Sequence, residues 1–443
     1  MQQVRFDEEF LWGCATASYQ VEGAIEEGGR KPSIWDTFSK IPGTVMNGDD
    51  GSVAVDQYHR YEQDIQLMAD LNFQAYRFSI AWPRIIPDGV GEVNMQGVEY
   101  YIRLSKELKD KGLEVVATLY HWDLPQVLQD KGGWANRETA YHFQAYAEAC
   151  YEHLGPFVDR WITLNEPFCT AYLGYRTGDH APGIKNDEQA NRAVHHLNLA
   201  HGLAMQSYRK TGLKAPIGIT LNPLMPRPAS RKKDDKLASE YARAFNTDVF
   251  LLPLFKQGYP KLVTEGLGIT YPIESGDMEI IAEKIDFLGI NYYQEGAVAY
   301  DENQKNKYRD VPSWQPVTNQ GWPVTPYGLL RILHYIQALD TSLPLYITEN
   351  GCANDDVVID GRIHDHLRCD YVNKHLAICK QALDEGINLK GYFIWSFLDN
   401  FEWAWGYSQR FGIIYVDYET QERIPKDSAY MLRDVIAGYC EFF

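Results

Sequence analysis

The sequence is poor in basic residues and lacks any long hydrophobic run. It has 42 lysines and arginines against 60 aspartates and glutamates, which gives a formal net charge of −18. This balance disfavours nucleic acid and anionic membranes as partners and suits an uncharged small molecule. No stretch approaches the roughly 20 apolar residues of a membrane span, and the first residues form no apolar signal core. We therefore expect a soluble, cytoplasmic protein.

Cofactor and metal motifs are also missing. The seven cysteines are odd in number and form no CxxC pair, which favours buried free thiols over disulfides or a metal site. No GxGxxG or P-loop is present, and His195, His196 and His201 do not repeat at i, i+4 as zinc ligands on a helix do. We expect these histidines to pack in the interior, and we expect neither a cofactor nor a metal.

Apolar, strand-like runs recur along the chain and alternate with helical patterns. Eight such runs are present, at residues 10–15, 75–80, 114–119, 161–164, 217–221, 285–290, 345–348 and 391–395. The helical patterns between them include residues 58–71, 98–111, 137–154 and 188–211. Eight strands that alternate with helices predict an α/β fold, a single (β/α)₈ TIM barrel that spans residues 1–443 as one catalytic domain.

The chain is longer than such a barrel needs. A (β/α)₈ barrel typically takes about 250 residues, and this chain has 443. We expect the excess to lie in long loops that wall a deep pocket, at residues 31–51, 171–183, 297–323 and 350–362. The sequence does not fix the oligomeric state, and a homo-oligomer stays open.

Two glutamates stand at the ends of predicted strands. Glu166 follows an apolar run and precedes Pro167, and Glu349 follows another and precedes Asn350 and Gly351. A carboxylate at the end of a buried strand is costly to desolvate, which favours a chemical role. Because functional residues of a barrel gather at the carboxyl ends of its strands, we expect the two glutamates to meet there.

Amide, imidazole, indole and carboxylate groups follow the other predicted strands. They include Gln20, His121, Trp122, Asn165, Asn291, Trp395, Glu402 and Trp403. Sugar hydroxyls bind amides and carboxylates, and the apolar face of a sugar ring stacks on an indole. Two carboxyl groups beside such a pocket indicate glycoside hydrolysis.

The chain resembles the bacterial β-glucosidases of glycoside hydrolase family 1 from end to end. The segments that carry the resemblance are residues 10–17, 19–23, 76–79, 121–125, 163–167, 289–293, 347–351 and 399–403. The resemblance implies a β-glycosidase that uses Glu166 as acid/base and Glu349 as nucleophile, with Arg77 and Tyr293 as partners of Glu349. A nearby arginine lowers a carboxylate pKa by about 1–3 units, so we expect a lowered pKa for Glu349 and a raised one for Glu166. Net retention follows, with the carboxyl groups about 5–5.5 Å apart.

The resemblance also implies roles in binding the sugar. Asn165 would hold the 2-hydroxyl, Trp395 would stack under the ring, and Glu402 would take the 4- and 6-hydroxyls. The 3- and 4-hydroxyls would fall to Gln20, His121 and Trp403, and the pocket would also include Trp122 and Asn291. Relatives that act on 6-phosphorylated sugars lack a carboxylate at the position of Glu402, so we expect unphosphorylated glycosides.

The leaving-group side is less defined. Trp322 matches a position that commonly stacks on the leaving-group sugar, and Trp405 stands where many relatives carry an acidic residue. An extra indole would favour aromatic leaving groups, but packing or an interface is an equal alternative for both tryptophans. Cys169 and Cys352, each three residues after a glutamate, are expected to pack behind the site.

Two alternatives to a hydrolase remain. A sugar-binding barrel that has lost catalysis would keep the fold, although such relatives usually lack one of the two glutamates. A glycosyl-transferring enzyme would use the same residues and the same intermediate, with an acceptor sugar in place of water.

Overall fold

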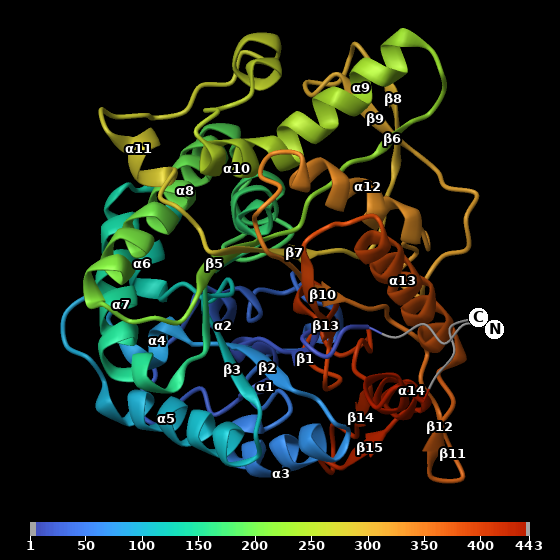
Figure 1. The fold of residues 1–443 in the computed structure, drawn as a ribbon. Coiled ribbons are helices and arrows are strands. Elements are labelled where there is room, and N and C mark those ends of the chain that lie inside the picture. Colours follow the sequence, from blue (N-terminus) through green and yellow to red (C-terminus); the bar gives the residue numbers. More distant parts are fainter. Residues whose placement is uncertain (1–5, 440–443) are drawn as a thin grey trace.

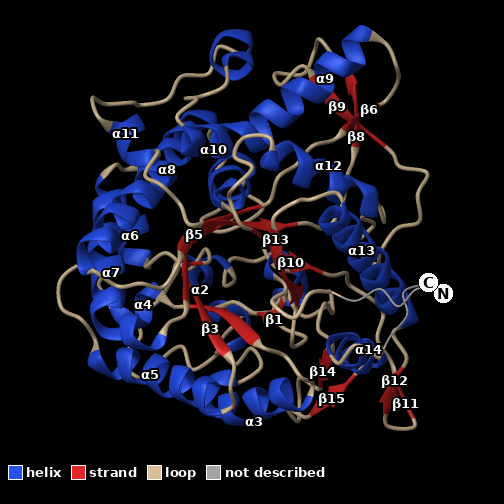
Figure 2. Cartoon of the chain, in the orientation of Figure 1, coloured by secondary structure: helices blue, strands red, loops and turns tan. Residues whose placement is uncertain are grey.

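The barrel is the centre of the molecule. The computed structural model describes residues 6–439, and within them eight parallel strands close on themselves in the order β1-β13-β10-β7-β5-β4-β3-β2. Figure 1 and Figure 2 show these strands enclosed by helices. The barrel strands are β1 (Leu11–Ala15), β2 (Ala75–Ser79), β3 (Glu114–Tyr120), β4 (Arg160–Asn165), β5 (Ile217–Leu221), β7 (Phe287–Asn291), β10 (Leu345–Asn350) and β13 (Leu389–Trp395). The predicted (β/α)₈ barrel is confirmed; that all 443 residues form one domain stays a prediction.

The eight predicted runs all form barrel strands, because each is buried on both faces and so reads as a continuous apolar segment. Two strand starts differ from the prediction by two residues: β7 begins at Phe287 instead of Ile285, and β13 begins at Leu389 instead of Gly391. Exposed Lys390 interrupts the apolar run there, although buried Leu389 pairs with Leu345 of β10.

The helices pack around the outside of the barrel (Figure 1). Helix α8 shows why they begin and end where they do: the Asn186 side chain accepts a bond from the Gln189 amide at 2.9 Å, and Gly212 ends the helix with a φ of 75°. The longer helices are α3 (Gln57–Asp70), α5 (Met95–Asp110), α7 (Glu138–Leu154), α8 (Asp187–Thr211), α9 (Lys233–Arg243), α12 (Pro326–Gln337), α13 (His366–Asp384) and α14 (Asp427–Ile436). The shorter ones are α1 (Ser18–Val21), α2 (Ile34–Phe38), α4 (Trp82–Ile85), α6 (Gln126–Gln129), α10 (Val249–Leu251) and α11 (Asp277–Ile281).

The long connections carry small structures of their own. Strands β8 (Ala297–Tyr300) and β9 (Tyr308–Val311) join β6 (Arg227–Pro228) in a sheet that lies beside α9, outside the barrel (Figure 1). Two antiparallel pairs are β11 (Val358–Ile359) with β12 (Arg362–Ile363), and β14 (Ile414–Val416) with β15 (Arg423–Pro425). A π-helical turn at Cys169–Thr177 follows β4. Other short turns of 3₁₀ or π type are Met46–Gly48, Gly133–Ala135, Gly155–Phe157, Ala244–Asp248, Leu252–Phe255, Leu262–Gly266 and Trp403–Trp405.

The interior confirms two expectations about packing. His195, His196 and His201 are buried on α8, where His195 bonds Asp277 and His201 bonds Thr163. Six cysteines are free thiols, five of them buried, and Cys440 lies outside the described residues. Among residues 6–439, no helix is both long and apolar enough to cross a membrane.

Candidate active site

A pocket of about 310 Å³ lies among the residues that follow the barrel strands. Ten of the predicted site residues line it: His121, Trp122, Glu166, Asn291, Tyr293, Trp322, Glu349, Trp395, Glu402 and Trp403. The other three lie directly behind its wall. Arg77 bonds Glu349, Asn165 bonds Asn291, and Gln20 bonds Glu402.

Glu166 is held just past the end of β4 in a constrained position. Its φ of 44° lies in the left-handed region, which a residue with a β-carbon adopts at a cost. The Asn291 amide donates to Oε1 at 2.6 Å, and the Cys169 thiol donates to Oε2 at 3.1 Å. Burial, with the charge of Glu349 next, raises the pKa of Glu166 to about 7. Glu166 can therefore hold a proton near neutral pH.

Glu349, the next-to-last residue of strand β10, has cationic and phenolic partners. Arg77 donates to Oε1 at 2.6 Å, and the Tyr293 hydroxyl donates to Oε2 at 2.7 Å. The expected lowering of its pKa is wrong. Burial raises the pKa of Glu349, and the opposing effects of Arg77 and Tyr293 offset only part of the rise.

The two carboxyl groups nevertheless differ in surroundings. After burial, the next largest influence on Glu166 is the negative charge of Glu349, whereas for Glu349 it is the positive charge of Arg77. The negative charge of Glu349 thus favours the protonated form of Glu166, and the positive charge of Arg77 favours the ionised form of Glu349.

A buried polar network connects Arg77 with Asn165 and His121. Arg77 donates to Asn165 Oδ1 at 2.6 Å, and Asn165 Nδ2 donates to His121 Nε2 at 3.0 Å. Two buried atoms, His121 Nδ1 and Gln20 Oε1, have no hydrogen-bond partner among the described residues. Leaving such buried atoms without a partner is costly unless a ligand binds them.

Aromatic rings form one wall of the pocket. The rings of Trp122 and Trp403 lie 4.6 Å apart, and Trp395 stacks on His121 at 5.7 Å. Beside them, burial and the charges of Glu349 and Glu166 raise the pKa of Glu402 to about 8. Indole faces next to a carboxyl group suit a sugar ring with its hydroxyls.

Two further tryptophans line the pocket. Trp322 packs against Tyr293 at 5.5 Å and Phe411 at 6.1 Å. Trp405 is 42% exposed and also contributes to the lining. Both indoles are therefore within reach of a ligand in the pocket.

Several residues of the pocket were not predicted. Asn222 directly follows β5 and lines the pocket, so the strand-end rule, applied to that strand too, would have found it. Cys169 does more than the expected packing, since its thiol contacts both Glu166 and the pocket. His180 and Phe411 come from connections without any motif that points to them.

Comparison with known proteins gives the family. A family model described as Glycosyl hydrolase family 1 matches residues 2–439. Beta-glucosidase A of Thermotoga maritima is 47% identical over 439 residues, with 98% of each chain covered. A bifunctional beta-D-glucosidase/beta-D-fucosidase of Bifidobacterium breve is 42% identical, again with 98% of each chain covered. The solved structure of the family 1 b-glucosidase from Thermotoga maritima matches with a TM-score of 0.96 at 47% identity, over 98% of this chain and 99% of that one. The chain therefore belongs to glycosyl hydrolase family 1.

Proposed function

We propose that this protein is a retaining β-glucosidase that releases terminal, non-reducing β-D-glucosyl residues from cello-oligosaccharides and aryl β-glucosides. β-Galactosides and β-fucosides are further candidate substrates. The observation that carries the proposal is the asymmetric carboxyl pair. Glu349 is fixed by Arg77 and Tyr293, while Glu166, with a pKa of about 7, keeps its proton.

In the first step the ionised Glu349 attacks the anomeric carbon, and the bond to the leaving-group oxygen breaks. Glu166 gives its proton to that oxygen, so the leaving group departs as a neutral alcohol. Arg77 and Tyr293 hold the attacking carboxylate by both oxygens, which orients it toward the sugar.

In the second step Glu166 acts as the base. Once Glu349 is an ester its charge is gone, so the charge that raised the pKa of Glu166 is gone as well. Glu166 then ionises more readily, takes a proton from water, and the hydroxide adds to the anomeric carbon as Glu349 leaves. Two inversions give net retention, for which we expect carboxyl groups about 5–5.5 Å apart.

The sugar is held by the network behind the pair. Asn165 takes the 2-hydroxyl, Trp395 stacks under the ring, and Trp122 and Asn291 complete the pocket. The 3- and 4-hydroxyls bind to the Trp403 indole and to the two atoms, one of Gln20 and one of His121, that have no partner among the described residues. Glu402 binds the 4- and 6-hydroxyls. A phosphate on the 6-hydroxyl would bring negative charge next to the three acidic side chains of the pocket, so we expect unphosphorylated glucosides to be preferred over 6-phosphorylated ones.

Trp322 and Trp405 contact the leaving group. The exposed face of Trp405 favours aromatic aglycones, so W405E should weaken an aryl β-glucoside more than cellobiose. The comparison of kcat/KM for 4-nitrophenyl β-glucoside and cellobiose checks this. An equal effect on both substrates would assign Trp405 to packing.

The test of the proposed reaction is the stereochemistry of hydrolysis. Proton NMR during hydrolysis of a nitrophenyl β-glucoside should show β-glucose first, with the α-anomer growing in only by mutarotation. Initial α-glucose would contradict retention, and no hydrolysis of any glycoside would favour a binding-only barrel. An added sugar or alcohol acceptor separates hydrolysis from transfer, because a transferase would give mainly transfer products.

The cellular role is also a proposal. The free thiols suit a reducing, cytoplasmic compartment. A place in cellulose degradation is supported by relatives named 1,4-beta-D-glucan glucohydrolase in Thermotoga neapolitana. Cell fractionation with an antibody to the protein checks the location.

A further inference from the structure

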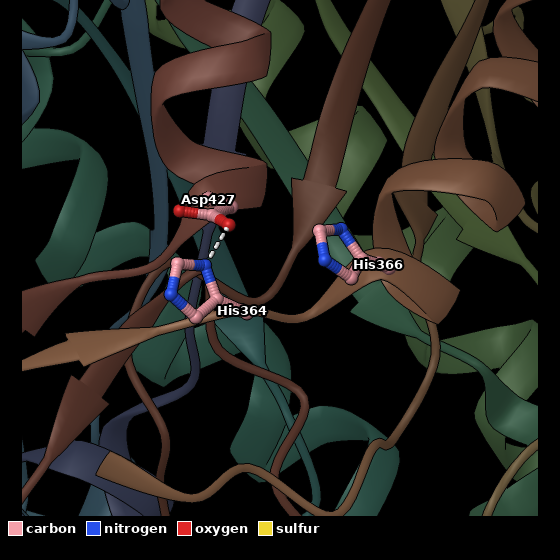
Figure 3. A group of neighbouring side chains, drawn as sticks. All are labelled: His364, His366 and Asp427. Atoms are coloured by element: carbon pink, nitrogen blue, oxygen red, sulfur yellow. Dashed lines mark hydrogen bonds and ion pairs between the residues drawn. The ribbon is translucent and has the colours of Figure 1, made fainter. Parts of the chain in front are cut away.

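Three side chains with metal-binding donor atoms lie together outside the pocket. His364 follows β12, His366 is the first residue of α13, and Asp427 is the first residue of α14. One donor atom from each lies within 4.8 Å of the others. Figure 3 shows the carboxylate of Asp427 and the two rings facing one small region.

The orientation of each group suits a shared ligand. His364 Nδ1 lies 2.6 Å from Asp427 Oδ2, while the other carboxylate oxygen accepts a bond from Arg362 at 3.3 Å. The His366 ring lies nearly parallel to that of His364 at 5.9 Å and makes no hydrogen bond within residues 6–439. His366 therefore has a free nitrogen to offer, and Asp427 has one oxygen directed at the histidines.

The backbone beneath the three groups is fixed by buried bonds. Asp365, which lies between the two histidines, accepts from the Ser428 amide at 2.9 Å and from its hydroxyl at 2.5 Å. Arg368 also pairs with Asp365. Because Ser428 follows Asp427, these bonds hold the two segments that carry the donor atoms in register, which reduces the ordering cost of binding.

The donor set decides which metals fit. Two imidazoles and one carboxylate suit Zn²⁺ and neighbouring first-row dications, whereas Mg²⁺ and Ca²⁺ prefer oxygen ligands. Arg362 and the N-termini of two helices place positive charge nearby, which weakens cation binding. The titration must therefore extend to millimolar metal.

We propose that His364, His366 and Asp427 form a binding site for a first-row transition dication, with Zn²⁺ as the probe. The ion takes the place of the proton shared by His364 and Asp427, and water completes its coordination. Bound in this way, it links the start of α13 to the start of α14 and stabilises the folded chain.

The test is isothermal titration of the metal-free, full-length protein with zinc chloride at neutral pH. The variant is H366A, which removes a ligand without breaking a hydrogen bond. The matched control is H334A, because exposed His334 also pairs with a carboxylate, Glu385, at 2.5 Å. We expect one zinc per chain in the wild type and in H334A, and an affinity at least about tenfold lower in H366A.

A thermal melt gives an independent readout that does not involve activity. At a hundredfold excess over the wild-type Kd, zinc should raise the melting temperature of the wild type by about 2–4 °C. The same zinc concentration should raise that of H366A by no more than about half as much. Absence of binding at millimolar zinc overturns the proposal. So does equal affinity in H366A and the wild type, since the zinc would then lie elsewhere, for example on the carboxyl groups of the pocket.

Discussion

The candidate active site and a second group of buried charges use the same kinds of side chain in different proportions. In the pocket, three acids, Glu166, Glu349 and Glu402, share one bonded cation, Arg77, which pairs with Glu349. In the second group, near α14, three acids meet three cations. We call this group the paired cluster; its members are Asp356, Asp365, Asp399, Arg368, Arg410 and Lys426.

The difference appears in the pKa values. Burial would raise the pKa of Asp356, but Arg368 and Lys426 outweigh it and the pKa is lowered. In the pocket the pKa of Glu166 rises to about 7 and that of Glu402 to about 8. The number of counter-charges thus decides whether a buried acid is a fixed ion that supports the fold or a group that exchanges protons.

The largest effect should come from E349Q, which removes the nucleophile. We expect kcat to fall by at least about 10⁴-fold with the fold intact, because Glu349 is the carboxylate that both Arg77 and Tyr293 bond. Steady-state kinetics with circular dichroism checks this. The control is E385Q, on the surface, and a loss below about tenfold in E349Q would contradict the assignment.

The E166Q variant separates the two carboxyl groups by role. Cellobiose hydrolysis should fall by about 10²–10⁴-fold because its leaving group needs a proton. Formation of the glycosyl-enzyme from glucosyl fluoride should fall far less, since fluoride leaves without that help. Rapid kinetics on both substrates makes the comparison. Equal losses would mean that Glu166 is not the acid.

The paired cluster should respond in stability. R368M leaves Asp356 and Asp365 without their buried partner, which should lower the free energy of unfolding by about 3–5 kcal/mol. Urea denaturation at pH 7 measures it, with the exposed pair variant K374M as control. A change below about 1 kcal/mol would show that the cluster is not a stabilising unit.

The E402Q variant tests how much the surplus of acids in the pocket lowers stability. The pKa of Glu402 is raised to about 8 in the folded protein, against about 4.3 in an unfolded chain. The stability that Glu402 contributes to the folded protein is therefore fully present below about pH 4.3, and it is lost as the pH rises through 8. Calorimetry should show E402Q gaining stability over the wild type from pH 5 to pH 8.5. A constant difference between the two proteins would contradict the raised pKa.

The smallest effect concerns Cys169. Activity (kcat/KM) should fall above about pH 7 as Glu166 loses its proton. The Cys169 thiol donates to Glu166 and lowers its pKa, so C169A should move this basic limb upward, by less than about one pH unit. The control is C369S, which lies away from the pocket. A downward shift in C169A would be inconsistent with the hydrogen bond.

Much of the fold was predictable because parallel barrel strands leave continuous apolar runs. The run at residues 217–221 matches β5 at both ends. The glutamates were predictable for the same reason, since each stands at the end of such a run. Polar residue types after the strands then pointed to a sugar, and the structure gathers those side chains around one pocket.

What the sequence could not give depends on contacts between distant segments. The pKa of Glu349 results from the depth of burial, which no local pattern encodes. The sequence also does not indicate the proposed metal site, because His364 and His366 meet Asp427 only when α13 packs against α14. Trp405 and Cys169 carried no pattern that distinguishes packing from a place in the pocket.

The most direct test of the central claim, that one carboxyl group attacks while the other carries the proton, is to trap the intermediate. The protein is incubated with 2-deoxy-2-fluoro-β-glucosyl fluoride and analysed by intact and peptide mass spectrometry. We expect one sugar mass on the peptide that contains Glu349. An adduct on Glu166, or no adduct in a protein that still hydrolyses a nitrophenyl β-glucoside, would contradict the assignment.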